Sequence, residues 1–110
     1  MKRIYISGPM TGLPGQNHNA FHQAAQQLRA LGYEVVNPAD TPVPSEGIHL
    51  EAWLKADLRQ MLDCDTIALL PGWQASKGAH LELHVAHRVG MTVVDVADLH
   101  RTELQEVIHA

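Results

Sequence analysis

Two acidic residues stand among the apolar residues of predicted amphipathic helices. Apolar side chains recur at helical spacing between Ser76 and Val89, and Glu82 lies in the middle of their face. A second such helix is predicted over 49–62, where Asp57 falls within the apolar face that begins with Leu50. A buried carboxylate that is neither paired nor protonated is costly, so such residues have a partner or a function. A structural partner at the rim is the simpler explanation for one of them, but two favour a functional site.

Small residues at the start of the Glu82 helix predict affinity for an anion such as phosphate. Ser76 and Gly78 lie where free backbone N–H groups and the helix dipole favour negative charge. The earlier loop over 7–15 contains Ser7, Thr11 and Gly12, which would add polar contacts. The spacing is neither that of a Walker A loop nor that of a GxGxxG motif. Ordinary turns also use Gly and Ser, so both interpretations stay open.

Strands and helices alternate along the predicted elements. The strands are expected at 4–6, 33–36, 65–70 and 91–96. A helix with its apolar stripe from Phe21 to Leu31 and Gly32 as its C-terminal cap precedes the second strand. The helices over 49–62 and 76–89 follow, and a closing helix is expected over 99–108. The proline-rich segment 37–48 is a connector or a lid.

This alternation predicts an α/β fold. We expect a three-layer Rossmann-like or flavodoxin-like parallel sheet in the order 2-1-3-4, with helices on both faces. A fifth short strand stays open as an alternative. Residues 1–110 form one domain in this interpretation. Parallel sheets bind ligands beyond the carboxyl ends of their strands, where the strand order reverses. The predicted site therefore lies between the loops at 7–15 and 71–78.

Composition narrows the function classes. A formal net charge of -4 argues against binding to nucleic acid through a basic face. The single Cys64 excludes an intrachain disulfide and a cysteine metal cluster. We found neither a signal peptide nor a membrane-spanning run, so a cytoplasmic protein without a membrane partner is expected. A stripe of histidines on one helix face, His80, His84 and His87, could in principle bind a metal ion. Its spacing differs from that of the HExxH motif, so exposure to solvent or a contact between subunits is the favoured interpretation.

Several short segments of the sequence together resemble those of a known family. The set comprises Ile4-Tyr5-Ile6-Ser7-Gly8, Asp57-Leu58, Cys64-Asp65 and Ser76-x-Gly78-x-x-x-Glu82-Leu83-x-x-Ala86. In order and spacing it is similar to the nucleoside 2-deoxyribosyltransferase superfamily, which includes the 2-deoxynucleoside 5′-monophosphate N-glycosidases. The resemblance covers nearly the whole chain and is most specific around Glu82. It points to a short phage and bacterial branch.

The resemblance implies a role for several residues. Glu82 would be the nucleophile that attacks the anomeric carbon, giving a covalent glycosyl intermediate that is resolved with retention. Asp57 would assist the leaving base, and Tyr5 would hold the nucleophile by a hydrogen bond. Ser76 is similar to the serine of the monophosphate hydrolases, whereas the transferases carry an acid there. The implied substrate-binding residues are Ser7, Gly8, Met10, Thr11, Gly12, Trp73, Ser76 and Gly78.

Two functions of different class remain open. The first is cleavage or transfer of the N-glycosidic bond of a nucleoside or its 5′-monophosphate, without a cofactor or a metal. The second is a non-catalytic module that binds or sequesters a nucleotide. The resemblance also implies a homodimer or a larger homo-oligomer. Trp73 would stack on a base or, as is commoner for a loop tryptophan, cover the core.

Overall fold

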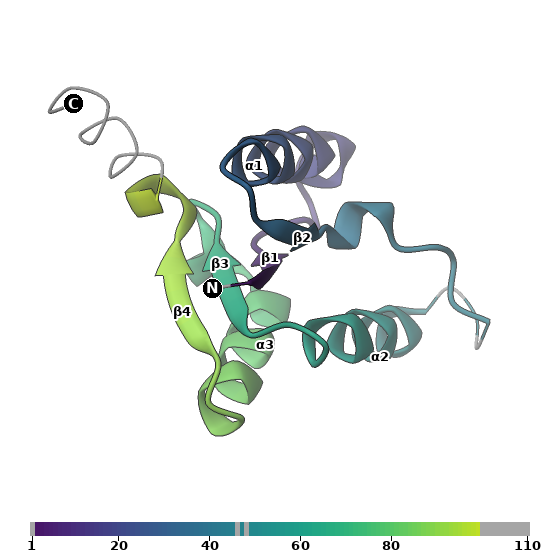
Figure 1. Cartoon of the computed structure of the whole chain (residues 1–110). Coiled ribbons are helices and arrows are strands. Elements are labelled where there is room, and N and C mark those ends of the chain that lie inside the picture. The colour runs from purple at the N-terminus through teal and green to yellow at the C-terminus, as the bar shows by residue number, and fades with distance from the viewer. Residues whose placement is uncertain (1, 46, 48, 100–110) are drawn as a thin grey trace, which may run out of the picture.

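Four parallel strands form one sheet in the order β2-β1-β3-β4 (Figure 1). The computed structural model describes residues 2–45, 47 and 49–99. The strands are β1 (Arg3–Ser7), β2 (Glu34–Val36), β3 (Thr66–Leu69) and β4 (Thr92–Asp95). The helices are α1 (His18–Ala30), α2 (Leu50–Met61) and α3 (Lys77–Arg88). The predicted α/β class and strand order are confirmed.

Two expected elements have a different outcome. The part of the chain that the structure describes contains no fifth strand. The predicted closing helix lies outside the described residues, apart from Leu99 at the end of a helical turn over 96–99. Within the described residues, no helix is both long enough and apolar enough to cross a bilayer.

α1 covers one face of the sheet, and α2 and α3 cover the other (Figure 1). Because successive side chains of a strand point to opposite faces, β1 supplies both layers of the core. Ile4 and Ile6 pack with Phe21 and Leu28 on the α1 side, in what we call the upper cluster. Tyr5 belongs to the lower cluster, on the side of α2 and α3, together with Met61, Cys64, Ile67, Leu69 and Ala86. The odd-numbered residues of β1 therefore face α2 and α3.

The ends of β1 and β3 approach each other closely where the strand order reverses. The amide of Leu70 donates to the carbonyl of Ser7 over 2.8 Å. A Cβ added to Gly8 would lie 2.7 Å from the Cβ of Leu70, closer than side chains can approach. Gly72 has a φ of 86°, and a Cβ there would lie 3.5 Å from Pro9. The loops that follow β1 and β3 are therefore in contact, as expected for the predicted site.

The loop after β1 is closed by a side-chain hydrogen bond. Asn17 donates from its Nδ2 to the carbonyl of Pro9 over 2.9 Å. Gln16 and Asn17 have φ angles of 52° and 60°, a left-handed conformation that non-glycine residues adopt at a cost. The Asn17 bond offsets part of that cost and keeps the loop folded back on itself.

Three residues expected on inward helix faces are exposed instead. Leu50 is 66% exposed, Leu81 39% and Val89 55%. α2 extends beyond the sheet (Figure 1), so its first residue lies away from the core and is largely exposed. In α3 the smaller residues Ala79 and Ala86 take the fully buried positions beside Glu82. The helical spacing of the apolar residues was predicted correctly, but the centre of the buried face of α2 and of α3 lies at other residues than predicted.

Candidate active site

Glu82 is buried in α3 and held by two hydroxyl groups from β1. Its side chain is 6% exposed. The Tyr5 Oη donates to Glu82 Oε2 over 2.5 Å, and the Ser7 Oγ donates to Oε1 over 2.7 Å. Both carboxylate oxygens thus have a donor, which fixes the orientation of the group. Tyr5 and Ser7 are two residues apart on one strand, so they reach the same face of the sheet.

Burial changes the ionisation of this cluster. Desolvation raises the pKa of Glu82 to about 7, against the lowering effect of the bonds from Tyr5 and Ser7. Burial also raises the pKa of Tyr5 well above its ordinary value, and the negative charge of Glu82 adds to that rise. Tyr5 consequently remains a hydrogen-bond donor over the whole physiological pH range.

Asp57 is the second acid at the site. It lies half-buried on α2, and desolvation raises its pKa to about 6, opposed by a hydrogen bond from Thr41. The charge of ionised Asp57 raises the pKa of both Glu82 and Tyr5. The charge of Asp57 therefore acts on the ionisation of the Glu82 carboxyl group. Two acids that titrate near neutral pH can exchange roles as proton donor, proton acceptor and nucleophile.

The start of α3 combines a cap with a close approach of α2. Ser76 is the N-cap residue, and its Oγ accepts a hydrogen bond from the amide of Ala79 over 3.1 Å. A Cβ added to Gly78 would be 3.8 Å from Leu54 and 3.9 Å from the Ser76 Oγ, which is ordinary contact distance. Packing therefore does not require glycine at position 78. The capping role of Ser76 explains its presence structurally, and the phosphate role remains a prediction.

The other predicted substrate-binding residues divide between the core and the surface. Met10 packs against the upper cluster, on the face of the sheet opposite Glu82. Thr11 and Gly12 are exposed at the tip of the loop. Trp73 packs against the lower cluster, and its ring centroid is 5.2 Å from that of His80. Trp73 thus covers the core, the commoner alternative for a loop tryptophan.

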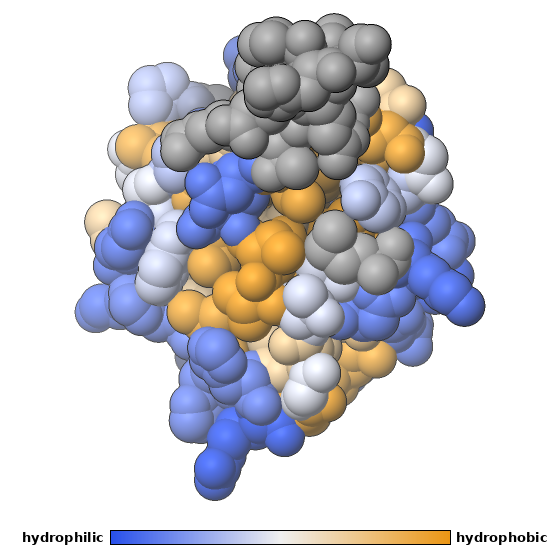
Figure 2. Space-filling view, turned by 60° about the vertical axis from the view of Figure 1, so that its left-hand side comes forward, coloured by the Kyte–Doolittle hydropathy of each residue, from blue (hydrophilic) through white to orange (hydrophobic). Residues whose placement is uncertain are grey.

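Two surface hollows lie near β4 rather than at Glu82. One has a volume of about 260 Å³ and is lined by Val93, Val94, Asp95, Asp98 and Leu99. The other, of about 200 Å³, lies between Trp73 and Asp98. Figure 2 shows apolar side chains in the middle of this face of the molecule. Neither hollow is lined by Glu82, Asp57 or Tyr5.

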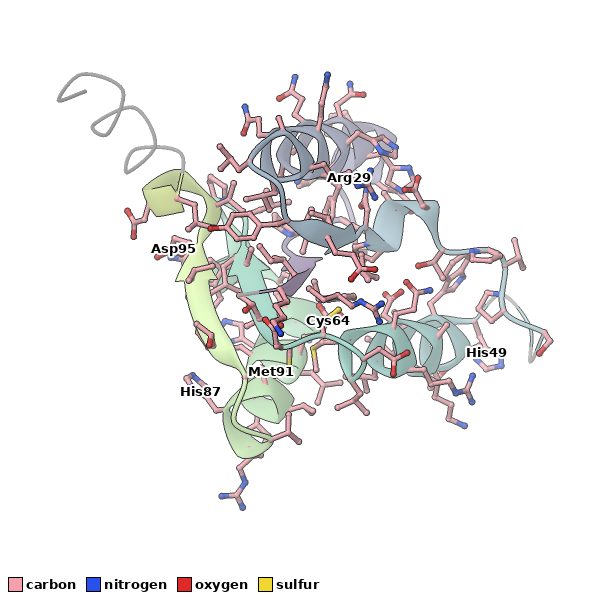
Figure 3. All side chains as sticks on the ribbon, viewed as in Figure 1. Arg29, His49, Cys64, His87, Met91 and Asp95 are labelled. Atoms are coloured by element: carbon pink, nitrogen blue, oxygen red, sulfur yellow. The ribbon has the colours of Figure 1, made fainter. Side chains whose placement is uncertain are left out.

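The remaining candidate residues have structural or surface positions. Asp65 accepts hydrogen bonds from the amides of Lys2 and Arg3 and from the Thr66 hydroxyl, so it shapes the start of the sheet. His87 extends from α3 away from the sheet, and Cys64 lies buried near the end of α2 (Figure 3). Across residues 2–45, 47 and 49–99, no three His, Cys, Asp or Glu side chains are placed to hold a metal ion.

Sequence reasoning missed two residues near Asp57. Thr41 lies 3.4 Å from Asp57 through its Oγ1, and Gln60 donates from its Nε2 to that oxygen over 3.2 Å. No spacing pattern links a loop threonine to a helix sixteen positions away. Ser7 donates its hydroxyl proton to Glu82, a contact that the sequence did not predict, and its role in substrate binding stays a prediction.

Comparisons with known proteins agree with this architecture. The chain resembles in structure the 2-desoxiribosyltransferase from Leishmania mexicana, with a TM-score of 0.66 over 86% of this chain. The two sequences are 17% identical, and the match spans 63% of that enzyme's chain. The expected resemblance is thereby confirmed at the level of the fold. No curated protein matches the sequence.

The family assignment comes from sequence. Residues 2–95 match a family described as a domain of unknown function, DUF4406. The match includes every described strand and helix from β1 to β4, and with them Tyr5, Asp57 and Glu82. The chain therefore belongs to the DUF4406 family, and its fold is similar to that of the Leishmania mexicana 2-desoxiribosyltransferase.

Proposed function

We propose that the protein cleaves or transfers the N-glycosidic bond of a nucleoside or its 5′-monophosphate. The observation that carries the proposal is the buried Glu82, which Tyr5 and Ser7 orient and whose pKa the charge of a second acid, Asp57, helps to raise. A carboxylate held in this way is suited to attack on carbon, because its oxygens are aligned before substrate binds. A binding module gains nothing from placing two acids with raised pKa values together.

The first step forms a bond between a Glu82 oxygen and the anomeric carbon C1′. The bond from C1′ to the base nitrogen breaks, and its electron pair leaves with the base. Asp57 in its protonated form donates a proton to the departing base while Glu82 reacts as the carboxylate, so only molecules with the proton on Asp57 and none on Glu82 react. Tyr5 keeps its proton and stays bonded to Glu82 as the carboxylate charge disappears into the ester.

The second step regenerates Glu82. Ionised Asp57 accepts a proton from water, and the water oxygen attacks C1′ from the face that the base left. The ester bond breaks and its electron pair returns to Glu82. A second base that attacks through its nitrogen would give transfer in place of hydrolysis. Two displacements at one carbon produce net retention of configuration.

The position of Ser76 favours a 5′-monophosphate as substrate. Its hydroxyl and the first amides of α3 lie at the positive end of that helix, where a phosphate is stabilised. The resemblance to the monophosphate hydrolases at this position supports the same choice. Because Ser76 already accepts a bond from Ala79, its hydroxyl proton remains available to a phosphate oxygen.

The test is a panel of deoxynucleosides, ribonucleosides and their 5′-monophosphates, with free base measured by chromatography. We expect base release from at least one deoxynucleoside 5′-monophosphate, abolished in Glu82→Gln. Glu51→Gln is the matched control, since Glu51 is exposed on the surface of α2. Tight binding of a nucleotide without release from any substrate would instead support the non-catalytic module.

A further inference from the structure

Thr41 connects the loop after β2 to the acid on α2. It follows the helical turn Pro38–Asp40, and its amide donates to the carbonyl of Pro38 over 3.0 Å. This bond and the turn fix the backbone at Thr41. Its Oγ1 lies 3.4 Å from Asp57 Oδ1 and 3.2 Å from Gln60 Nε2. All three side chains are half-buried.

The donors and acceptors around Thr41 determine which way its hydroxyl proton points. The hydroxyl of Thr41 has one proton, whereas Asp57 and the Gln60 carbonyl oxygen are both acceptors within 3.4 Å. The shorter contact runs from the Gln60 amide nitrogen to Thr41. An amide proton donated to Thr41 occupies a lone pair of the hydroxyl oxygen. The hydroxyl proton is then directed to Asp57.

We infer that Thr41 is a positioning residue for the leaving-group acid, orienting the Asp57 carboxyl group through a hydroxyl whose direction is set by Gln60. The role in catalysis rests on the proposed function, but the hydrogen-bond relay does not. Gln60 and Asp57 are three positions apart on α2, so both side chains reach the same side of the helix. The loop after β2 thus has a defined contact with the reacting groups.

The other titratable groups near Asp57 come from different elements. The charge of ionised Asp57 raises the pKa of Tyr5 on β1 and of Glu82 on α3. Burial raises the pKa of Asp57 itself. Thr41 has the opposite effect, because a donated hydrogen bond stabilises the carboxylate. Loss of the Thr41 hydroxyl should consequently make Asp57 hold its proton to higher pH.

The test is a carbon-13 NMR titration of aspartate-labelled protein, with the Asp57 signal assigned from its loss in Asp57→Asn. In Thr41→Val we expect the Asp57 midpoint to rise by about 0.5 to 1 pH unit. This is less than the roughly 1 to 2 units expected for losing a short bond to a charged group, because the contact is 3.4 Å long and only part-buried. Thr41→Ser keeps the hydroxyl and should restore the wild-type midpoint. Thr92→Val, at an exposed threonine of β4, is the matched control and should leave the midpoint unchanged.

A second variant tests the relay without altering the loop. Gln60→Met removes the amide at similar length, and the Asp57 midpoint should rise by less than in Thr41→Val. If the Asp57 midpoint is unchanged in Thr41→Val, the inference is overturned. If the midpoint rises in Thr41→Val but is unchanged in Gln60→Met, the role assigned to Gln60 is overturned. If the protein is active as an enzyme, the limb of the kcat–pH profile that reports Asp57 should shift to higher pH in Thr41→Val, and KM should not change. Because the titration needs no substrate, an inactive protein would refute the proposed function and leave this result standing.

Discussion

The hydroxyl of Tyr5 donates to the carboxylate of Glu82 over 2.5 Å, although 77 positions separate the two residues in the chain. The bond joins the centre of β1 to the buried face of α3. Tyr5 is fully buried, so water does not compete for its hydroxyl. This one contact both aligns Glu82 and opposes the effect of burial on its ionisation.

Tyr5→Phe should lower the rate of base release by about 10- to 100-fold, the range expected for losing one hydrogen bond to a charged group. The pKa of Glu82 should rise, because the lost bond stabilises the carboxylate. The measurement is kcat across pH, with Tyr33→Phe on the upper cluster as control. An unchanged rate would mean that Tyr5 only packs.

Asp57→Asn should lower the pKa of Glu82. The negative charge of Asp57 raises that pKa in the native protein, and asparagine keeps the shape without the charge. Titration of the labelled Glu82 carboxyl by NMR measures the change. Base release should slow most for nucleobases that leave poorly without a proton. A Glu82 midpoint that stays the same would show that the two acids are not coupled.

The pH dependence of stability should report Glu82. Its pKa is raised from 4.5 to about 7 on folding, so its contribution is fully present below pH 4.5 and is lost as the pH rises through about 7. Relative to wild type, Glu82→Gln should therefore gain on the order of 2–3 kcal/mol between pH 4.5 and pH 8. Urea unfolding at several pH values measures this difference. A difference independent of pH would contradict a buried, ionisable Glu82.

Two glycines of the candidate site should respond oppositely to alanine. Gly8→Ala places a Cβ 2.7 Å from Leu70, so β1 and β3 must separate, and we expect a loss of about 1–3 kcal/mol. The Cβ added in Gly78→Ala would lie at ordinary contact distance from its nearest neighbour outside the backbone of α3, Leu54 at 3.8 Å, so this variant should gain about 0.5–1 kcal/mol. Thermal unfolding compares them. If Gly78 also admits the substrate phosphate, its variant should show a higher KM despite the gain in stability.

The sequence was sufficient to predict the fold and to single out Glu82 and Asp57 as acids on the inward faces of helices. Apolar runs and helical periods predicted the strand order, because parallel sheets with right-handed crossovers allow few arrangements. Glu82 could be recognised because a carboxylate within an apolar helix face conflicts with its surroundings. Tyr5 became a candidate only through the family resemblance, since a tyrosine in a buried strand is unremarkable by itself.

The side-chain contacts of the site depend on how distant segments pack together, which a local sequence pattern does not determine. The bond from Ser7 to Glu82 joins residues 75 positions apart, so it depends on how β1 and α3 pack together and not on any local spacing. Thr41 reaches Asp57 because a helical turn after β2 directs the loop toward α2. The exposure of Leu50 likewise follows from how far α2 extends beyond the sheet.

The central claim is that Glu82 forms a covalent bond with the sugar, and mass spectrometry tests it most directly. A 2′-fluorinated deoxynucleoside 5′-monophosphate slows both steps, because fluorine destabilises the positively charged transition state at C1′. After denaturation and proteolysis, we predict one added sugar phosphate on the peptide that contains Glu82, and no adduct in Glu82→Gln. Base release from this substrate with no adduct, or with an adduct on another residue, would contradict the account.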